Sequence, residues 1–212
     1  MQTVIPRLYA SAPESLPFAP SLDIHAFLLQ RERGNLLVYS VGELEAEAQD
    51  IEELGGVTRR YLNHRHEAAF ASEQNIGPLF VHENERKSVA SKLGVEGTFS
   101  DRHVIDDDFE IIPTPGHTSG ATCFLWDNGE HRALFTGDTV YLDEGEWITA
   151  VLESSDRAAY IESLELMREL DFDVLVPWAA TGGGPVHATT DRSDARRRIE
   201  AILQRIKAGE DR

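Results

Sequence analysis

The residues best suited to chemistry are histidines and an aspartate that follow predicted strands. His64 and His66 lie two apart in the stretch NHRHEAAF, residues 63–70. In an extended segment such side chains share a face, so both imidazoles can bind one metal ion about 2.0–2.1 Å from each nitrogen. His117, on a tight Pro-Gly turn, can supply a third nitrogen, and Asp138 can supply an oxygen. Three histidines with an open fourth position can lower the pKa of bound water to about 7.

Each of these residues follows a segment whose apolar pattern predicts a strand, namely Val57–Tyr61, Glu110–Thr114 or Arg132–Thr136. Strand ends that open onto loops are where layered folds usually build their sites. Further strands are predicted at Ile24–Leu29, Leu36–Val41, Leu79–His82, Ala121–Trp126 and Val174–Val176. Helical patterns cover Glu43–Leu54, Glu83–Leu93, Ser155–Leu170 and Asp191–Ala208. This order predicts sheets covered by helices, and no linker divides the chain, so we expect one domain over residues 1–212.

Composition restricts the partners of this chain. The 212 residues carry 20 basic and 37 acidic side chains, a net charge of −17. Such a charge opposes binding to nucleic acid and to anionic membranes, so we expect a small-molecule substrate or ligand. The single cysteine, Cys123, excludes an internal disulfide and is expected in the core. Because no apolar run approaches about 18 residues and the start does not read as a secretion signal, we expect a cytoplasmic protein.

Other residue patterns exclude several classes of enzyme. The helical His-Glu-x-x-His spacing of one class of zinc peptidase is absent. No dinucleotide-binding glycine pattern follows a predicted strand, and Ser119 follows a turn instead of a strained elbow, which opposes a serine hydrolase. The acidic run 106–108 has the residue type of a metal site, but we expect it to form a turn with solvated carboxylates.

The order of the histidine and aspartate motifs resembles that of the metallo-β-lactamase-fold superfamily, over nearly the whole chain. The strongest part of the likeness is FEIIPTPGHTSGATCFLWDNGEHRALFTGDTVY, residues 109–141, where two predicted strands separate PGHT from TGDT. The resemblance implies an α+β fold, a four-layer αββα sandwich with its site at one edge of the two packed sheets. It also implies a metal, typically zinc and sometimes iron or manganese. Most members hydrolyse thioesters, lactams, lactones or phosphoesters.

The resemblance also assigns the residues of the metal site. The first metal pocket of the family matches His64, His66 and His117, and the aspartate that bridges two metals in dinuclear members matches Asp138. The second pocket of the family uses an Asp-His pair and a late histidine. The positions that match them here are Ala68, Ala69 and Ala179. Alanine offers no lone pair, so we expect one divalent metal, with zinc preferred and iron or manganese as alternatives.

Three functions are compatible with this pattern. The first is a single-metal hydrolase of a small ester, thioester or lactone, in which Asp138 is the catalytic residue that orients the water or becomes a fourth ligand. The second is a non-catalytic binding or sensor protein, which the three alanines motivate. The third is a mononuclear iron oxygenase with His64, His117 and Asp138 as its ligands. The oligomeric state stays open.

Four further side chains near these motifs carry expectations of their own. Glu67 would point away from His66 in an extended segment, so we expect a solvated carboxylate, with a contribution to the site as the alternative. His187 is expected to be a surface histidine, with metal ligation as the alternative. Trp178 either fills the space of the missing ligand or forms a wall of the substrate pocket. Trp147 is expected to pack against the core, with a place on the pocket rim as the alternative.

Overall fold

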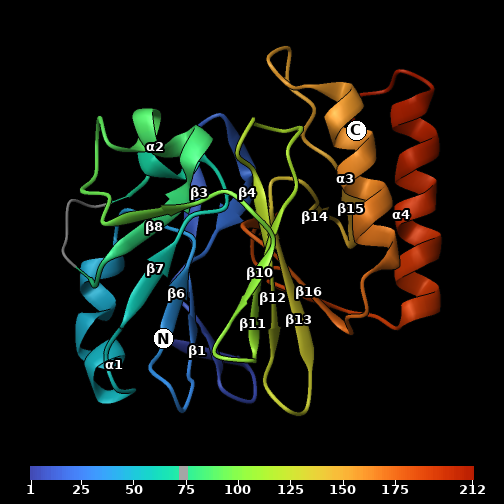
Figure 1. Cartoon of the computed structure of the whole chain (residues 1–212). Coiled ribbons are helices and arrows are strands. Elements are labelled where there is room, and N and C mark those ends of the chain that lie inside the picture. Colours follow the sequence, from blue (N-terminus) through green and yellow to red (C-terminus); the bar gives the residue numbers. More distant parts are fainter. Residues whose placement is uncertain (72–75) are drawn as a thin grey trace.

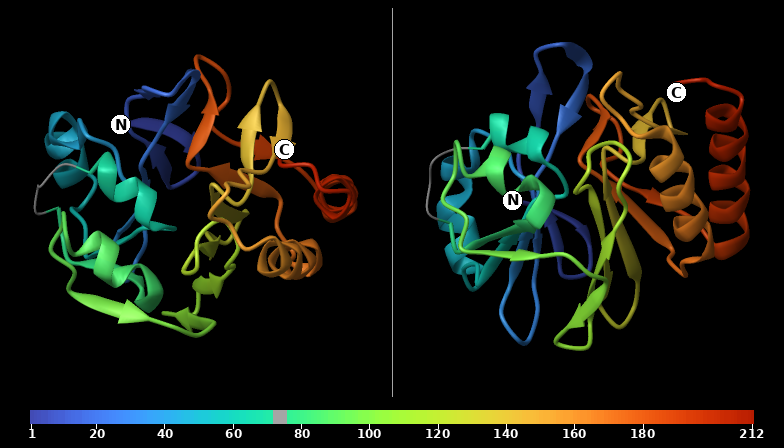
Figure 2. Two further views of the ribbon diagram at one scale, coloured as in Figure 1. Left: turned by 90° about the horizontal axis from the view of Figure 1, so that it is seen from above. Right: turned by 45° about the horizontal axis from the view of Figure 1, so that its top comes forward.

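Two β-sheet layers pack face to face, and helices cover both outer sides (Figure 1). The structure is a computed structural model and describes residues 1–71 and 76–212. Helices α1 (Ala48–Glu53) and α2 (Glu83–Val89) lie on one side, and α3 (Arg157–Glu169) and α4 (Arg192–Lys207) lie on the other. The view from above shows the same order of layers (Figure 2, left). The expected α+β four-layer sandwich is confirmed.

The first layer is a seven-stranded sheet with the order β1-β2-β5-β6-β7-β8-β9. Its strands are β1 (Gln2–Ile5), β2 (Leu8–Ala10), β5 (Phe27–Leu29), β6 (Leu36–Val38), β7 (Arg59–Tyr61), β8 (Leu79–His82) and β9 (Gly97–Phe99). The pairs from β6 through β9 are parallel. Parallel neighbours need crossover connections, which are supplied by η1 (Leu44–Glu47) with α1, by η2 (Arg65–Ala69), and by α2. The carboxyl ends of β7 and β8 therefore open at the same edge.

The second layer contains two sheets, with the orders β10-β11-β12-β13-β16-β18 and β15-β14-β17-β4-β3. The strands of the first are β10 (His103–Ile105), β11 (Phe109–Pro113), β12 (Thr122–Asp127), β13 (Arg132–Gly137), β16 (Val174–Pro177) and β18 (Ala188–Thr189). Those of the second are β3 (Glu14–Leu16), β4 (Ala19–Ile24), β14 (Tyr141–Asp143), β15 (Glu146–Ile148) and β17 (Ala179–Thr181). Strands β13 and β16 pair parallel, and α3 lies in the connection between them.

One apolar core fills the space between the sheet layers, and a second lies under α3 and α4. In the first core the rings of Phe27, Tyr39 and Phe135 meet edge to face, at centroid distances of 5.9 to 6.0 Å. Strands β5 and β6 are buried at every position, which explains their unbroken apolar sequences. Cys123 is fully buried, as expected. No helix in the described ranges is long and apolar enough to cross a membrane.

The observed strands differ from the predicted ones where the chain changes sheet and at sheet edges. The predicted strand Ile24–Leu29 is interrupted, because the chain leaves one sheet at His25 and enters the other at Phe27. The buried His25 fixes this crossing, since its backbone N–H donates to Trp178 O at 3.1 Å and its Nδ1 lies 3.0 Å from Ser11 O. Short edge strands such as β9 and β18 have no predicted counterpart, because two or three residues show no periodicity.

Candidate metal centre

Three histidines and one aspartate that are far apart in the sequence meet beside the ends of β7, β11 and β13. His64 follows β7, His66 lies in η2, His117 lies in the loop between β11 and β12, and Asp138 follows β13. One ligand atom from each lies within 4.8 Å of all the others. Among residues 1–71 and 76–212, this is the only group of three or more histidine, cysteine, aspartate or glutamate side chains close enough to share a metal ion. The structure therefore brings together all four residues that the sequence singles out.

The segment that carries the first two histidines is a short 3-10 helix, whereas the sequence predicts an extended segment. Only His64 is extended, with φ −156° and ψ 167°, and it is the N-cap of η2. The rings of His64 and His66 still converge, with centroids 5.0 Å apart. The prediction that the two imidazoles share one point is thus met, but the backbone conformation assumed for it is wrong.

A buried glutamate ties the two histidine-bearing loops together. Glu85, in the first turn of α2, is 1% exposed, and its carboxylate accepts the backbone N–H of Arg65 at 3.2 Å and that of Gly120 at 2.7 Å. Arg65 belongs to η2, and Gly120 belongs to the loop of His117. A Cβ at position 120 would lie 2.6 Å from Glu85 Cγ, so glycine is needed for this approach. The sequence gives no signal for this role, because acidic residues at a helix start are common for electrostatic reasons alone.

Tyr160 of α3 anchors the remaining loops of the site. Its hydroxyl donates to Thr139 O at 2.6 Å and accepts the backbone N–H of Ala150 at 3.3 Å. The Pro-Gly turn packs on the same residue, because Gly116 has φ +146° and a Cβ there would lie 2.4 Å from Tyr160 Cα. Ala150 O in turn lies 2.6 Å from His117 Nδ1. One helical residue thus holds both the third histidine and the loop that follows β13.

The ligand atoms have the spacing that a tetrahedral metal site requires. Ligands about 2.0–2.1 Å from a tetrahedral metal lie about 3.3 Å from one another. His66 Nδ1 lies 3.1 Å from His117 Nε2, and Asp138 Oδ2 lies 3.3 Å from His64 Nε2 and 3.6 Å from His117 Nε2. Both ring nitrogens of His64 are buried, and neither makes a hydrogen bond within the described part of the chain. These four side chains therefore fit a divalent metal ion.

Oxygen atoms lie behind two of the rings, next to Nδ1. Glu67 Oε1 lies 3.2 Å from His64 Nδ1, just as Ala150 O lies close to His117 Nδ1. In a neutral ring, an oxygen next to Nδ1 favours the proton on that nitrogen and leaves the lone pair of Nε2 for a metal ion. Glu67 is completely buried, and Oε1 also accepts the backbone N–H groups of Asn63 at 2.7 Å and His64 at 3.0 Å. The expectation of a solvated Glu67 is therefore wrong, because the 3-10 turn returns this side chain to His64.

Burial and neighbouring charges shift the pKa values of all four groups. Burial would lower the pKa of His64, but the carboxylates of Asp138 and Glu67 outweigh it and raise that pKa to about 10. Burial and the charge on His64 lower the pKa values of His66 and His117 to about 4. Burial would raise the pKa of Asp138, but the histidines outweigh it and hold that pKa below its usual value. The metal-free site at neutral pH thus has an ionised Asp138 and two neutral rings ready to bind a cation.

The three alanines that the family resemblance assigns to a second metal pocket lie in apolar or exposed surroundings. Ala68 is buried in a small apolar cluster that includes side chains of β8 and α2. Ala69 is exposed. Ala179, at the start of β17, is 3% exposed and packs against the core between the sheets. None of these methyl groups can bind a metal.

The two tryptophans near the site have different surroundings. Trp178 is buried, donates from Nε1 to Ser40 O at 2.9 Å, and meets the His64 ring edge to face at a centroid distance of 5.6 Å. It therefore packs against the ring of His64. Trp147 stacks on Phe172 in the core under α3 and α4. Its expected role as a core contact is confirmed.

His187 does not belong to the four-residue group. It is half-buried and lines a separate hollow of about 360 Å³ with Leu142, Pro185 and Ala188. The alternative that His187 supplies a substitute ligand finds no support in this placement.

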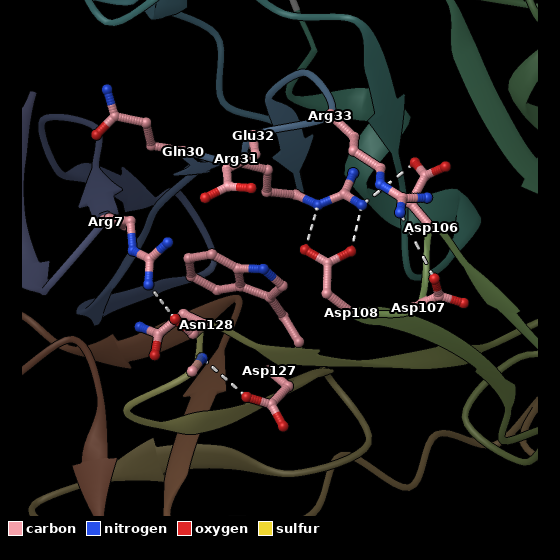
Figure 3. Close-up of a pocket in the computed structure, with 12 residues that line it drawn as sticks. Arg7, Gln30, Arg31, Glu32, Arg33, Asp106, Asp107, Asp108, Asp127 and Asn128 are labelled. Atoms are coloured by element: carbon pink, nitrogen blue, oxygen red, sulfur yellow. Dashed lines mark hydrogen bonds and ion pairs between the residues drawn. The ribbon is translucent and has the colours of Figure 1, made fainter.

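The acidic run 106–108 forms the turn between β10 and β11, at the opposite end of β11 from the loop of His117. It lines a hollow of about 300 Å³ that is drawn in Figure 3. The Arg31 guanidinium contacts the carboxylate of Asp108 through two nitrogens and that of Asp106 at 3.3 Å. The side chain of Asp107 is 92% exposed. The predicted turn is confirmed, but two of its three carboxylates pair with the buried Arg31, and this pairing opposes a metal site here.

Comparison with protein families places the chain in a known class. The family described as the metallo-beta-lactamase superfamily matches residues 26–179, which is more than half of the chain. The chain therefore belongs to the metallo-beta-lactamase superfamily. No curated protein gives a significant match to the sequence.

Several solved structures share the fold over most of their length. A metallo-beta-lactamase from Pontibacter korlensis is similar with a TM-score of 0.72 and 16% identity, over 96% of this chain and 97% of its own. A metallo-beta-lactamase family protein from Thermus thermophilus has a TM-score of 0.65 and 18% identity, over 97% and 81%. ETHE1 from Myxococcus xanthus has a TM-score of 0.62 and 20% identity, over 93% and 90%. At these identities the likeness establishes the fold alone.

Proposed function

We propose that this protein is a single-metal hydrolase of a small ester, thioester or lactone. The observation that carries the proposal is the group of four side chains whose ligand atoms lie within 4.8 Å of one another and suit one tetrahedral cation. His64, His66 and His117 would hold the metal, for which zinc is preferred over iron or manganese. When bound, such a metal supplies Lewis acidity, which activates water near neutral pH and polarises the carbonyl group of a substrate.

Asp138 is the residue to which we assign a catalytic role in this proposal. Its carboxylate has a lowered pKa and is 19% exposed, so it is ionised and accessible from solvent. Its backbone is held by Tyr160, whose hydroxyl lies 3.1 Å from Asp138 O. A carboxylate fixed in this way can accept a hydrogen bond from the attacking water and orient it. As a fourth ligand, the same group would close the site.

The proposal of one metal in place of two rests on the second pocket. Ala68, Ala69 and Ala179 stand where the family resemblance expects ligands, and they are packed in apolar surroundings or exposed. A mechanism in which two ions hold the attacking and leaving oxygens therefore lacks its second ion.

The third histidine favours zinc over the iron of an oxygenase. An oxygenase needs two histidines and one carboxylate, with the other positions open. His66 adds a third nitrogen at the same point, because its Nδ1 lies 3.1 Å from His117 Nε2. Three nitrogens around one point suit zinc, and the fourth position stays open for water when Asp138 does not bind the metal.

Metal analysis combined with turnover tests this function. Protein purified without added metal should contain about one zinc per chain by mass spectrometry and should hydrolyse members of a panel of esters, thioesters and lactones. His117→Ala should abolish both, whereas His187→Ala, outside the group, should change neither. Unchanged turnover in His117→Ala would refute the proposal, and two ions per chain would refute its single-metal form. One bound ion with no turnover would indicate the binding or sensor protein instead.

A further inference from the structure

A small apolar pocket opens beside Asp138. It has a volume of about 160 Å³ and is lined by Leu16, Phe18, Ala19, Leu22, Asp138, Tyr141, Ala150 and Ala179. Apart from the aspartate, every lining side chain is apolar or aromatic. The pocket therefore joins one charged group of the metal centre to a surface that favours hydrocarbon.

The outer wall of the pocket is the hairpin of β3 and β4. Phe18 lies at its turn and is 76% exposed, which is unusual for so large an apolar side chain. Its ring meets that of Phe70 edge to face at 6.4 Å, and Phe70 meets Trp178 at 5.4 Å. A row of aromatic rings thus runs from the hairpin to the tryptophan that packs behind His64.

The inner wall of the pocket is fixed to the metal centre. Ala150 supplies both a lining side chain and the carbonyl oxygen that lies 2.6 Å from His117 Nδ1. Ala179, which stands where the family resemblance expects a ligand of a second metal, supplies another part of this wall. The methyl group of Ala179 leaves room in the pocket for part of a bound substrate, whereas a histidine side chain at this position would fill that room.

The lining determines the charge and the size of the group that fits. The lining residues include no lysine, arginine or histidine, so no side chain of the pocket would pair with a carboxylate or phosphate group. An apolar cavity of about 150 Å³ is large enough to bind benzene. The volume here is therefore close to that of one aromatic ring or a short alkyl chain.

We propose that this pocket binds an uncharged apolar group of the substrate, about the size of a benzene ring or a chain of four to six carbons. This inference rests on the proposed hydrolase function, because it places that group next to the reacting carbonyl. It narrows the substrate class to esters, thioesters or lactones with a short alkyl or aryl substituent.

A chain-length series tests the inference. For 4-nitrophenyl acetate, butyrate and hexanoate, kcat/KM should rise about threefold to fourfold per methylene until the pocket is full, as expected for burial of apolar surface. Phe18→Ala should reduce this dependence, and Ala179→Leu should shift the preference to acetate. Val104→Ala, which removes an exposed apolar side chain from β10, is the matched control and should leave the series unchanged. A kcat/KM that is independent of chain length, or that favours an anionic succinyl ester, would overturn the inference.

A binding measurement separates this inference from the hydrolase proposal. If no ester is turned over, the hydrolase proposal fails. Binding of benzyl alcohol, monitored by NMR, then tests whether the pocket binds an apolar group. Chemical-shift changes that Phe18→Ala weakens and benzoate does not reproduce would support an apolar pocket. An absence of benzyl alcohol binding to the wild-type protein would refute it. Phe18 is so exposed that its replacement should not impair folding.

Discussion

Replacing Glu67 by glutamine removes one negative charge behind His64 while keeping the local hydrogen bonds. Oε1 of Glu67 accepts two backbone N–H groups and lies 3.2 Å from His64 Nδ1, and an amide oxygen can take its place. Oε2 has no hydrogen-bond partner within the described residues, so an NH₂ group there breaks no bond. The main loss is the charge that favours the proton on Nδ1 and makes Nε2 a stronger ligand.

The expected magnitude follows from this arrangement. Loss of an outer-shell partner of a metal-binding histidine typically lowers metal affinity about 10- to 100-fold, or about 1.4 to 2.7 kcal/mol. Burial raises the pKa of the Glu67 carboxyl, whereas His64 and the backbone N–H groups of Asn63 and His64 favour its ionised form. Because Glu67 is completely buried, solvent does not screen this charge, and we expect the zinc Kd of Glu67→Gln to rise within this range.

Competition with a chromophoric chelator would measure this Kd, and circular dichroism of the metal-free variant would verify its fold. Glu165→Gln, which changes a carboxylate of α3 that contacts Lys207 far from the site, is the control and should leave the Kd unchanged. A Kd for Glu67→Gln within threefold of wild type would refute the argument that Glu67 orients His64.

Three further outcomes are expected. Zinc binding at pH 8 should release about one proton, because His64 with a pKa of about 10 is protonated in the metal-free site and must lose its proton to bind zinc. The zinc affinity should therefore rise as the pH approaches 10. Heats of zinc binding measured by calorimetry should depend on the ionisation enthalpy of the buffer. Gly137→Ala should destabilise the fold by about 2 to 4 kcal/mol in thermal unfolding, because Gly137 has φ +55° and the new Cβ would lie 2.1 Å from the Asn63 side chain. Gly145→Ala is the control: Gly145 has φ +82° but open space around it, so this change should cost only about 1 kcal/mol. Burial raises the pKa of the Cys123 thiol to about 12, so a thiol reagent at pH 8 should label it only after unfolding in guanidinium, and rapid labelling of the native protein would contradict the structure.

The long elements of this fold can be predicted from sequence because their signals are local. The predicted strand Leu79–His82 is β8, residue for residue, and α4 lies within one residue of its predicted ends. Its start is marked by Asp191, whose side chain accepts the backbone N–H groups of Ser193 and Asp194. The interruption of the predicted strand at His25 depends on which sheet receives the next residues, and no local pattern carries that information.

The candidate site is predictable in its ligands but not in their supports. Three histidines and one aspartate that each follow a predicted strand are enough to predict the four-residue group, and the likeness of residues 109–141 to a known family strengthens the prediction. Glu67 and Glu85 escape such reasoning, because acidic side chains are solvated far more often than buried and only tertiary contacts reverse this. The same holds for Tyr160, whose spacing in α3 identifies a core residue but not the two backbone groups that its hydroxyl contacts.

The four side chains of the candidate metal centre come from both sheet layers, since His64 and His66 follow a strand of the first and His117 and Asp138 follow strands of the second. An ion bound by all of them would link three segments that lie between residues 64 and 138 and would bind the folded chain far better than the unfolded one. At a free concentration one hundred times Kd, such an ion adds about 2.7 kcal/mol to the stability of a protein. That is a large share of the roughly 5–15 kcal/mol that usually holds a domain folded. The folded fraction of this protein in a cell should therefore depend on the free concentration of the metal, whether or not any substrate is present.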